Sequence, residues 1–445
     1  AVVIGVFIGI LGLNCFYTVK EQEQAVLLTL GQASTVSESG LHFKVPFIQK
    51  VRKVDTTIKG FTMGYNQNTN ATIEEEAFAK CKLSKVIIPD SVTSIGAEAF
   101  RHCESLTNVL IPNSVTTIGV DAFSYCSSLT NVTISDSLTS ISPGAFDGCR
   151  SLTTISIPNG VTTIESNAFL NCSSLTSISI PDGVTNIGKS ALKGCSSLTS
   201  IIIPNSVTSI GESAFANCSS LTSFVIPYSI TKIGQYMFEN CNSLTSVTIP
   251  NSVTEIGDYA FRYCTSLASI AIPYGVMSIN IASFQGCTNL TRIVIPDSVT
   301  SINTSAFRNC RSLTSVVIPD NVSSIGNSAF EGCSLLTNIL IPDNVTSIGS
   351  SAFRGCSSLT SVVIPDSVTS ISSDAFSGCS SLTSVVIPDS VTIIGDCAFY
   401  NCSALKDVYY TGSEEEWAEI SIDNWLSSNS YLINATKHFN YVPEE

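Results

Sequence analysis

Apolar residues recur along most of the chain with a fixed period of 23 residues. Between Cys103 and Cys402 a cysteine stands at every 23rd position, and a phenylalanine precedes it by three residues in every case except Leu192. A leucine follows each cysteine by three residues, and a proline follows six residues later, with Ser135 the one exception before Pro388. Constant apolar positions at a period of this size indicate a solenoid, in which each coil buries its apolar face against its neighbours.

Each repeat predicts two short strands and a turn. The stretch L-T-S-V-x-I alternates apolar and polar residues and is rich in β-branched types, which favours a strand. The proline after it ends that strand, and the following Asp/Asn-Ser or Asp/Asn-Gly pair is typical of a turn. V-T-S-I-G is a second extended piece, and x-x-A-F-x-G-C predicts a tight helical or irregular turn. We therefore predict a mainly β repeat solenoid of about 14 to 15 coils.

The residues before the array lack this period. Residues 1–17 form an apolar run without charge that begins without methionine, and we expect it to be the C-terminal part of a transmembrane segment. A signal-peptide core is the alternative, although no A-x-A cleavage site follows. Glu23–Gly31, Gly40–Phe47 and Lys50–Tyr65 predict short strands. The predicted domains are a membrane segment (1–17), a small β segment (18–76), a repeat array (77–405) and a C-terminal cap (406–445).

The C-terminal 40 residues depart from the consensus. Ser413 and Glu416 have the S-x-x-E spacing of a capping box, which predicts the start of a short helix that carries Trp417. Terminal repeats of a solenoid are atypical because they cover an otherwise exposed end of the sheet. We therefore interpret this segment as a cap.

Charge and composition narrow the class of partner. The net charge is -14 and charged residues make up only 13% of the chain, against roughly 25% in ordinary globular proteins. Nucleic-acid binding needs a basic surface, and the largest basic group here is Lys50, Arg52 and Lys53. We predict no nucleic-acid partner. An acidic, hydroxyl-rich chain suits a secreted or surface-exposed protein.

Cysteine is abundant but periodic. Fourteen of the 17 cysteines share one repeat position, so a stacked array would place neighbouring thiols about 4.8 Å apart. A disulfide could bridge that separation, but small apolar thiols in the core explain the same ladder without oxidation. We favour reduced, buried thiols.

The sequence predicts neither catalysis nor a cofactor. His42, His102 and His438 lie in three different segments, and no zinc-protease, nucleophile-elbow or phosphate-loop motif occurs. His102 adjoins Cys103, which belongs to the cysteine ladder, so no nucleophile has an oriented base. We assign no catalytic and no metal-binding residues. An aspartate follows the proline in five successive coils, which suits either an Asx-turn, in which the side chain caps its own backbone, or a calcium site, and we favour the Asx-turn. These residues are Asp297, Asp320, Asp343, Asp366 and Asp389.

One outward strand position marks the candidate binding face. It lies between two inward residues, and period-2 alternation points it away from the core. From Val294 onward this position is apolar in five successive coils, where solubility alone favours serine or threonine; such patches often mark binding sites, although β-branched residues also simply favour strands. Tyr228 and Tyr274 replace Asp or Asn after the proline and are further candidates, because tyrosine is common at interfaces. The stripe comprises Val294, Val317, Leu340, Val363 and Val386.

Two resemblances follow from these residues. FYTVKEQEQAVLLTLG and GLHFKVPFIQKVRKVDTTIKGF resemble the opening of the stomatin/prohibitin/HflK group (band 7, or SPFH, membrane proteins), most of all HflK-type modulators of the membrane protease FtsH. That implies membrane attachment and an FtsH-like protease as a possible partner, but the match stops at Glu76 and the rest of the family's domain is absent.

The array itself resembles the BspA-like leucine-rich repeats over more than 300 residues. This resemblance implies a right-handed solenoid with a parallel sheet and, since the family includes bacterial adhesins, a protein or glycan ligand. The first hypothesis is a non-enzymatic, membrane-tethered surface protein whose array is extracytoplasmic and binds a macromolecule through its sheet face. The alternatives are an HflK-like modulator with an added repeat domain, a structural spacer, and a recombined reading frame joined near Glu76.

Overall fold

The chain folds as a stack of short β coils. The computed structural model describes residues 28–29, 32–33, 61–62 and 71–442. The chain divides into two compact units between Ser219 and Ser220. Each unit is a mainly β run of coils of about 23 residues, and the two units together contain about 15 turns. The predicted fold class is therefore confirmed at this level.

The predicted membrane segment, residues 1–17, lies outside the described residues, and so does the predicted strand Gly40–Phe47. Among the helices that the structure does describe, none has both the length and the apolar character to cross a membrane.

Two short strands fall within the other strands predicted before the array. They are β1 (Leu28–Thr29), which pairs antiparallel with β2 (Gln32–Ala33), and β3 (Phe61–Thr62). β3 pairs parallel with β5 (Val86–Ile87) of the first coil, so a strand from the segment before the array joins the sheet of the repeats.

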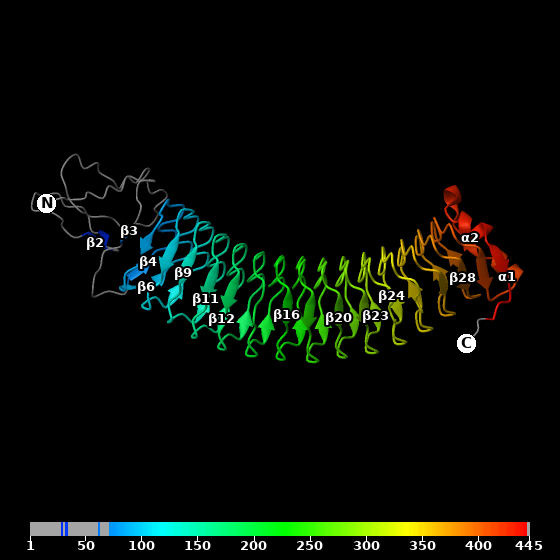
Figure 1. The fold of residues 1–445 in the computed structure, drawn as a ribbon, viewed down its shortest axis with the longest axis horizontal. Helices are drawn as coiled ribbons and strands as arrows, with labels where there is room; N and C mark the ends of the chain where they lie inside the picture. Colours follow the sequence, from blue (N-terminus) through cyan, green and yellow to red (C-terminus); the bar gives the residue numbers. More distant parts are fainter. Residues whose placement is uncertain (1–27, 30–31, 34–60, 63–70, 443–445) are drawn as a thin grey trace, which may run out of the picture. The chain divides into compact units, whose positions relative to one another are not determined.

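The first unit carries two rows of short parallel strands (Figure 1). The L-T-S-V-x-I pieces form β5 and then β7 (Asn108–Leu110), β9 (Asn131–Thr133), β11 (Thr154–Ser156) and β13 (Ser177–Ser179). The V-T-S-I-G pieces form β4 (Ala71–Ile73), β6 (Val92–Ile95), β8 (Thr117–Ile118), β10 (Ser140–Ile141), β12 (Thr163–Ile164), β14 (Asn186–Ile187) and β15 (Ser209–Ile210). Both predicted strands of the repeat are thus present.

The second unit repeats this arrangement (Figure 1). Its first row contains β16 (Ser223–Val225), β18 (Ser246–Thr248), β20 (Ser269–Ala271), β22 (Arg292–Val294), β26 (Ser361–Val363), β28 (Ser384–Ile387), β30 (Asp407–Tyr410) and β32 (Thr436–His438). Its second row contains β17 (Lys232–Ile233), β19 (Glu255–Ile256), β21 (Ser278–Ile279), β23 (Ser301–Ile302), β24 (Ser324–Ile325), β25 (Ser347–Ile348), β27 (Ser370–Ile371), β29 (Ile393–Ile394) and β31 (Ser421–Ile422).

The core of each unit is built from stacked equivalents of the same residue. The phenylalanine before each cysteine is fully buried, and in the second unit the ring of Phe330 stacks on Phe307 and Phe353 with centroids 5.3 and 5.4 Å apart. The alanine, cysteine, leucine and inward valine and isoleucine of most coils are buried as well. Because every coil places these side chains at the same height, the apolar interior runs from coil to coil.

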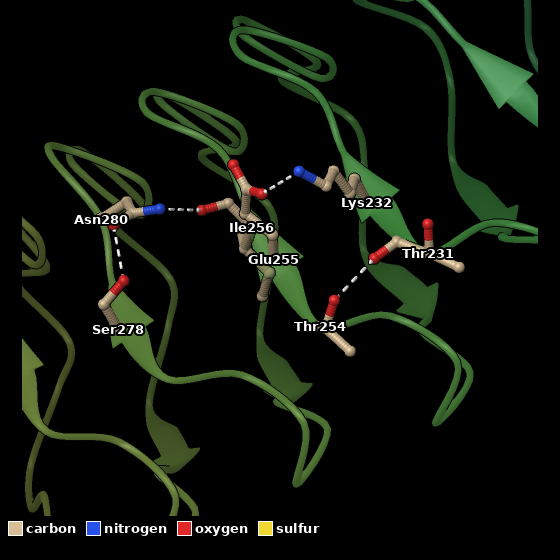
Figure 2. Close-up of polar contacts among 7 residues, drawn as sticks. All are labelled: Thr231, Lys232, Thr254, Glu255, Ile256, Ser278 and Asn280. Atoms are coloured by element: carbon tan, nitrogen blue, oxygen red, sulfur yellow. Dashed lines mark hydrogen bonds and ion pairs between the residues drawn. The ribbon is translucent and has the colours of Figure 1, made fainter.

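Polar side chains join coils along the second row of strands. Figure 2 shows Thr254 Oγ1 donating to the carbonyl oxygen of Thr231 at 3.4 Å, and Lys232 Nζ lying 2.8 Å from Glu255 Oε2. Asn280 Nδ2 donates to the carbonyl oxygen of Ile256 at 2.8 Å. Serine and threonine at these positions therefore satisfy backbone groups of the preceding coil while facing solvent.

The x-x-A-F-x-G-C segment forms an irregular turn rather than a helix. Two residues per coil adopt a left-handed conformation, such as Ser328 (φ 55°) and Gly332 (φ 73°). Ser328, Phe330 and Gly332 donate their N–H groups to carbonyl oxygens of the next coil at 2.7 to 2.9 Å, while Ala329 donates within its own turn. The alternation gives this side of the solenoid its own inter-coil hydrogen bonds.

Substitutions of Gly355 measure how much stability a side chain costs at the left-handed position before cysteine. Gly355 has φ +70°, and an added Cβ would meet only Gly332 atoms at 3.8 Å. Gly355→Ala is therefore expected to cost about 1–2 kcal/mol through backbone strain alone. Asparagine tolerates this conformation better and already occupies the position at Asn309 (φ 59°) and Asn401 (φ 56°). Gly355→Asn should cost less than Gly355→Ala in urea unfolding; equal costs would contradict the strain argument.

The C-terminal segment adds one strand to each row of the second unit. Ser413 caps α1 (Glu414–Ala418) in a complete capping box with Glu416, which confirms the predicted helix. The segment continues through a 3-10 turn (Trp425–Ser427) and α2 (Ser430–Asn434). β31 then pairs with β29, and β32 pairs with β30, so each row gains one more strand.

Candidate functional site

The predicted apolar stripe follows the first row of strands in the second unit, with Val294, Val363 and Val386 in β22, β26 and β28, and with Val317 and Leu340 joined by an isolated β-bridge. The exposed fraction is 58% for Val294, 76% for Val317, 71% for Leu340 and 46% for Val363, and Val386 is half-buried. These five side chains, called the apolar stripe below, occupy the same position in five successive coils.

Strand alternation explains why the stripe faces outward. Val316 and Ile318 flank Val317 and are only 6% and 3% exposed, as expected when successive residues point to opposite faces. Coils pair in register, with Val317 opposite Leu340 and Val363 opposite Val386. Neighbouring stripe residues are therefore about one strand spacing apart, about 4.8 Å.

The two predicted tyrosines are also exposed, each by 77%. Tyr228 and Tyr274 sit in β-turns closed by Ile230 N–H donating to Pro227 and Val276 N–H donating to Pro273, both at 3.1 Å. Tyr274 belongs to the coil of β20, which pairs with β22 of the stripe. Tyr274 therefore borders the stripe, whereas Tyr228 lies two coils earlier in the sequence repeat.

A row of carboxylates accompanies the stripe. Each stripe residue is followed three positions later by an exposed aspartate in the same coil. We call this set the carboxylate row: Asp297, Asp320, Asp343, Asp366 and Asp389. Sequence reasoning identified both sets but did not connect them, although their shared coils were visible in the repeat alignment.

A turn is present at each aspartate of the carboxylate row, but the backbone closes it, and the predicted cap by the aspartate side chain is absent from these described coils. In each coil the valine two residues after the aspartate donates its N–H to the proline before it, at 3.0 to 3.1 Å. Within the described ranges none of the five carboxylates has a hydrogen-bond or ion-pair partner, and no group of three or more His, Cys, Asp or Glu side chains is placed to hold a metal ion. Like charges one strand spacing apart repel by about 1 kcal/mol in water.

The cysteine ladder is buried and hydrogen-bonded. In the second unit Cys333 Sγ donates to the carbonyl oxygen of Phe307 at 3.2 Å, and Cys356 Sγ donates to that of Phe330 at 3.3 Å. Burial raises the pKa of Cys333 to about 12 and that of Cys356 well above its ordinary value. A thiol with a raised pKa is a poor nucleophile at neutral pH, which supports the structural interpretation of these cysteines.

The described histidines contact carboxylates. His102 Nδ1 lies 3.7 Å from Glu104 Oε1, and His438 Nε2 lies 2.9 Å from Asp407 Oδ1. The third, His42, is outside the described residues. These contacts give the two described histidines structural roles at the surface.

Sequence reasoning missed an aromatic cluster on the turn side of the second unit. The rings of Tyr236 and Tyr259 stack 4.7 Å apart, and the Arg262 guanidinium lies 5.3 Å from the Tyr259 ring and 4.7 Å from the Tyr263 ring. Arg262 also lies 3.4 Å from Glu239. The signal was tyrosine at three left-handed positions of two successive coils, since most other coils have serine, asparagine or glycine there.

The repeat positions that build the stripe, the row and the ladder match a known family. Residues 71–199, 185–314 and 300–424 match the BspA type leucine-rich repeat region. The chain belongs to this family. These BspA-type repeats cover most of the chain, and residues 17–76 match the SPFH domain / Band 7 family. Both predicted resemblances are thus confirmed, and neither matched family links the chain to catalysis.

Two solved structures with similar repeats come from bacteria. A leucine-rich repeat protein from Bacteroides ovatus is 28% identical, with a TM-score of 0.70, over 95% of this chain and all of that one. A leucine rich cell surface protein from Faecalibacterium prausnitzii is also 28% identical, with a TM-score of 0.45, over 91% of this chain and 97% of that one. No curated protein matches the chain.

Proposed function

We propose that the chain is a non-enzymatic bacterial repeat protein that binds a macromolecular partner through the apolar stripe. The observation that carries this proposal is the exposure of Val317 and Leu340, at 76% and 71%, in the middle of five apolar coils. Contiguous exposed apolar surface is unfavourable in water unless it is covered. Leucine-rich-repeat proteins typically bind macromolecules, which supports the same assignment.

The preformed surface suits recognition of a large partner. Val363 and Val386 lie on paired strands, and Val317 pairs with Leu340 through a β-bridge, so binding orders little of the chain and loses little entropy. We further propose that Tyr274 contributes at the edge of the stripe and that Tyr228 contributes from its more distant coil, because both tyrosines are exposed and aromatic residues are enriched at interfaces.

Substitution of the stripe tests the proposal. The triple variant V317S/L340S/V363S keeps strand-compatible residues but removes the exposed apolar surface, so it should lose capture of the partner while its melting temperature stays nearly unchanged. The measurement is comparative pull-down from host-surface extracts with the full chain, with melting followed by circular dichroism.

The matched control removes exposed apolar residues elsewhere. Leu110 and Ile202 are 62% and 85% exposed at the same strand position in the first unit, but each belongs to a run of only two apolar coils, Leu110 with Ile87 and Ile202 with Val225. L110S/I202S should retain capture. Equal capture by the stripe variant and this control would show that the stripe is not the binding surface.

The wider organisation is part of the proposal. We propose that residues 1–17 anchor the chain in a membrane, followed by a partial band 7 segment (18–76), the repeat array (77–405) and a cap (406–445), with the array on the extracytoplasmic side. The apolar run and the band 7 match support the anchor. An adhesive role at the cell surface would follow from this placement.

A second candidate function rests on the match at residues 17–76. A modulator of an FtsH-like membrane protease would co-purify with that protease, and the stripe variant would co-purify equally well, because contact would be made by the N-terminal segment. Sequencing the source DNA across the codons for Thr72 to Cys81 tests whether the two parts form one gene. Separate genes would exclude this candidate.

A further inference from the structure

The carboxylate row and the apolar stripe occur in the same five coils. Asp297 accompanies Val294, Asp320 accompanies Val317, and the pairing continues to Asp389 and Val386. The outward position of the preceding coils is mixed, with Thr248 and Ala271. The face therefore carries two parallel lines of different chemistry, one apolar and one anionic, that begin and end together.

The turn backbone holds the aspartates in place without using their carboxylates. Asn321 Nδ2 donates to the carbonyl oxygen of Asp297, and Asn344 Nδ2 donates to that of Asp320, both at 2.7 Å. The side chain after each aspartate thus fixes the preceding turn. The carboxylate itself is exposed and has no partner in the described part of the chain.

Three glutamates of the second unit, Glu239, Glu255 and Glu331, pair with Lys or Arg of a neighbouring coil. Glu255 pairs with Lys232 at 2.8 Å, and Glu331 pairs with Arg308 at 3.0 Å. On the strands that bear the stripe, Arg292 is the one basic residue in the described coils from 291 to 389 that shares the outward face. The row therefore remains a line of uncompensated negative charge, in contrast to its surroundings.

We infer that the partner of the stripe is a cationic polypeptide segment, in which lysine or arginine side chains meet the carboxylate row while apolar side chains cover the stripe. This inference rests on the proposed function and names the chemistry of its partner. A nucleic acid or an anionic glycan would meet like charge along the row. A simple cation would neutralise the row but leave the stripe exposed, and only a chain that carries both kinds of group satisfies both lines.

Peptide probes test the inference on the full chain. The stripe spans four coil intervals of about 4.8 Å, which an extended peptide of about eight residues covers. Three fluorescent peptides of this length would each combine four leucines with four lysines, four serines or four glutamates. The lysine peptide is expected to bind best in fluorescence anisotropy, with an affinity that falls as salt rises from about 50 to about 500 mM.

Two charge variants separate the effect of the carboxylate row from the effect of the protein's net charge. D320N/D343N/D366N removes three carboxylates of the row. It should weaken the affinity for the lysine peptide about tenfold, since each exposed lysine–aspartate pair contributes modestly. D90N/D136N/D182N removes three exposed aspartates from the equivalent turn position in the first unit and should change the affinity less than about twofold. The stripe variant V317S/L340S/V363S should abolish binding of the lysine peptide.

The outcomes distinguish this inference from the proposed function. Equal binding of the lysine and serine peptides, or equal weakening by the two charge variants, overturns the inference of a cationic partner, while loss of binding in the stripe variant alone still supports the stripe as a binding surface. Full binding by the stripe variant overturns both. A wild-type dimer in sedimentation that the stripe variant dissociates would identify a second copy as the occupant and overturn the inference.

Discussion

Replacing Phe330 with alanine is expected to destabilise the second unit by about 3–5 kcal/mol. The ring is fully buried and stacks on Phe307 and Phe353, with interplanar angles of 16° and 2°. In a stacked array each coil is stabilised mainly by its two neighbours, so a cavity here weakens both interfaces. Urea unfolding followed by circular dichroism measures the loss.

The array supplies its own control for this substitution. Leu192 occupies the equivalent position of its coil and is fully buried, so leucine fits this position. Phe330→Leu should therefore cost only about 1–1.5 kcal/mol, because most of the volume is retained. If Phe330→Ala and Phe330→Leu lowered the free energy of unfolding by similar amounts, packing of the ring would not be what stabilises the stack.

Raising the pH above about 9 is expected to destabilise the fold through its buried thiols. Burial raises the pKa of Cys287, Cys333 and Cys402 to about 12, whereas an unfolded thiol ionises near pH 8.5. Unfolding therefore releases protons in this window, so stability is fully present below about pH 8.5 and falls as pH rises toward 12. Within this window each thiol lowers the free energy of unfolding by about 1.4 kcal/mol per pH unit, so the three together lower it by about 4 kcal/mol per pH unit.

A thiol-deleted variant separates this effect from the titration of tyrosine and lysine. The free energy of unfolding in urea, with a reductant present, would be measured at pH 7.5, 9 and 10 for the wild type and for C287A/C333A. The variant is expected to be less stable at neutral pH. Its free energy of unfolding should nevertheless fall less steeply with pH than that of the wild type, by about 3 kcal/mol per pH unit, because two titrating thiols are gone. Equal slopes would contradict the thiol mechanism.

The two strands of each coil and the buried positions were predictable because the repeat restates them fourteen times. Val316 and Ile318 face inward and Val317 outward in the structure, as strand alternation requires. The turn after proline and the capped helix at Ser413 were predictable for the same kind of local reason, since each depends on side chains a few residues apart.

The geometry of the A-F-x-G-C turn was not predictable in detail. Its left-handed residues include Ser328 and Tyr259, residue types that give no local signal for this conformation. What stabilises them is the next coil, whose carbonyl oxygens accept their N–H groups. A single repeat contains no such acceptor, so the left-handed conformation is stabilised only when coils stack.

By itself, the sequence determined the coil length, the stacked Phe, Cys and Leu interior, and the identity of the exposed stripe, because each depends on spacing along the chain. Only the tertiary structure decided that the aspartates beside the stripe lack partners while Glu255 and Glu331 have them. Residues 23 positions apart become neighbours only when coils stack in register, and the balance of charge on that face depends on which side chains then come within reach of one another.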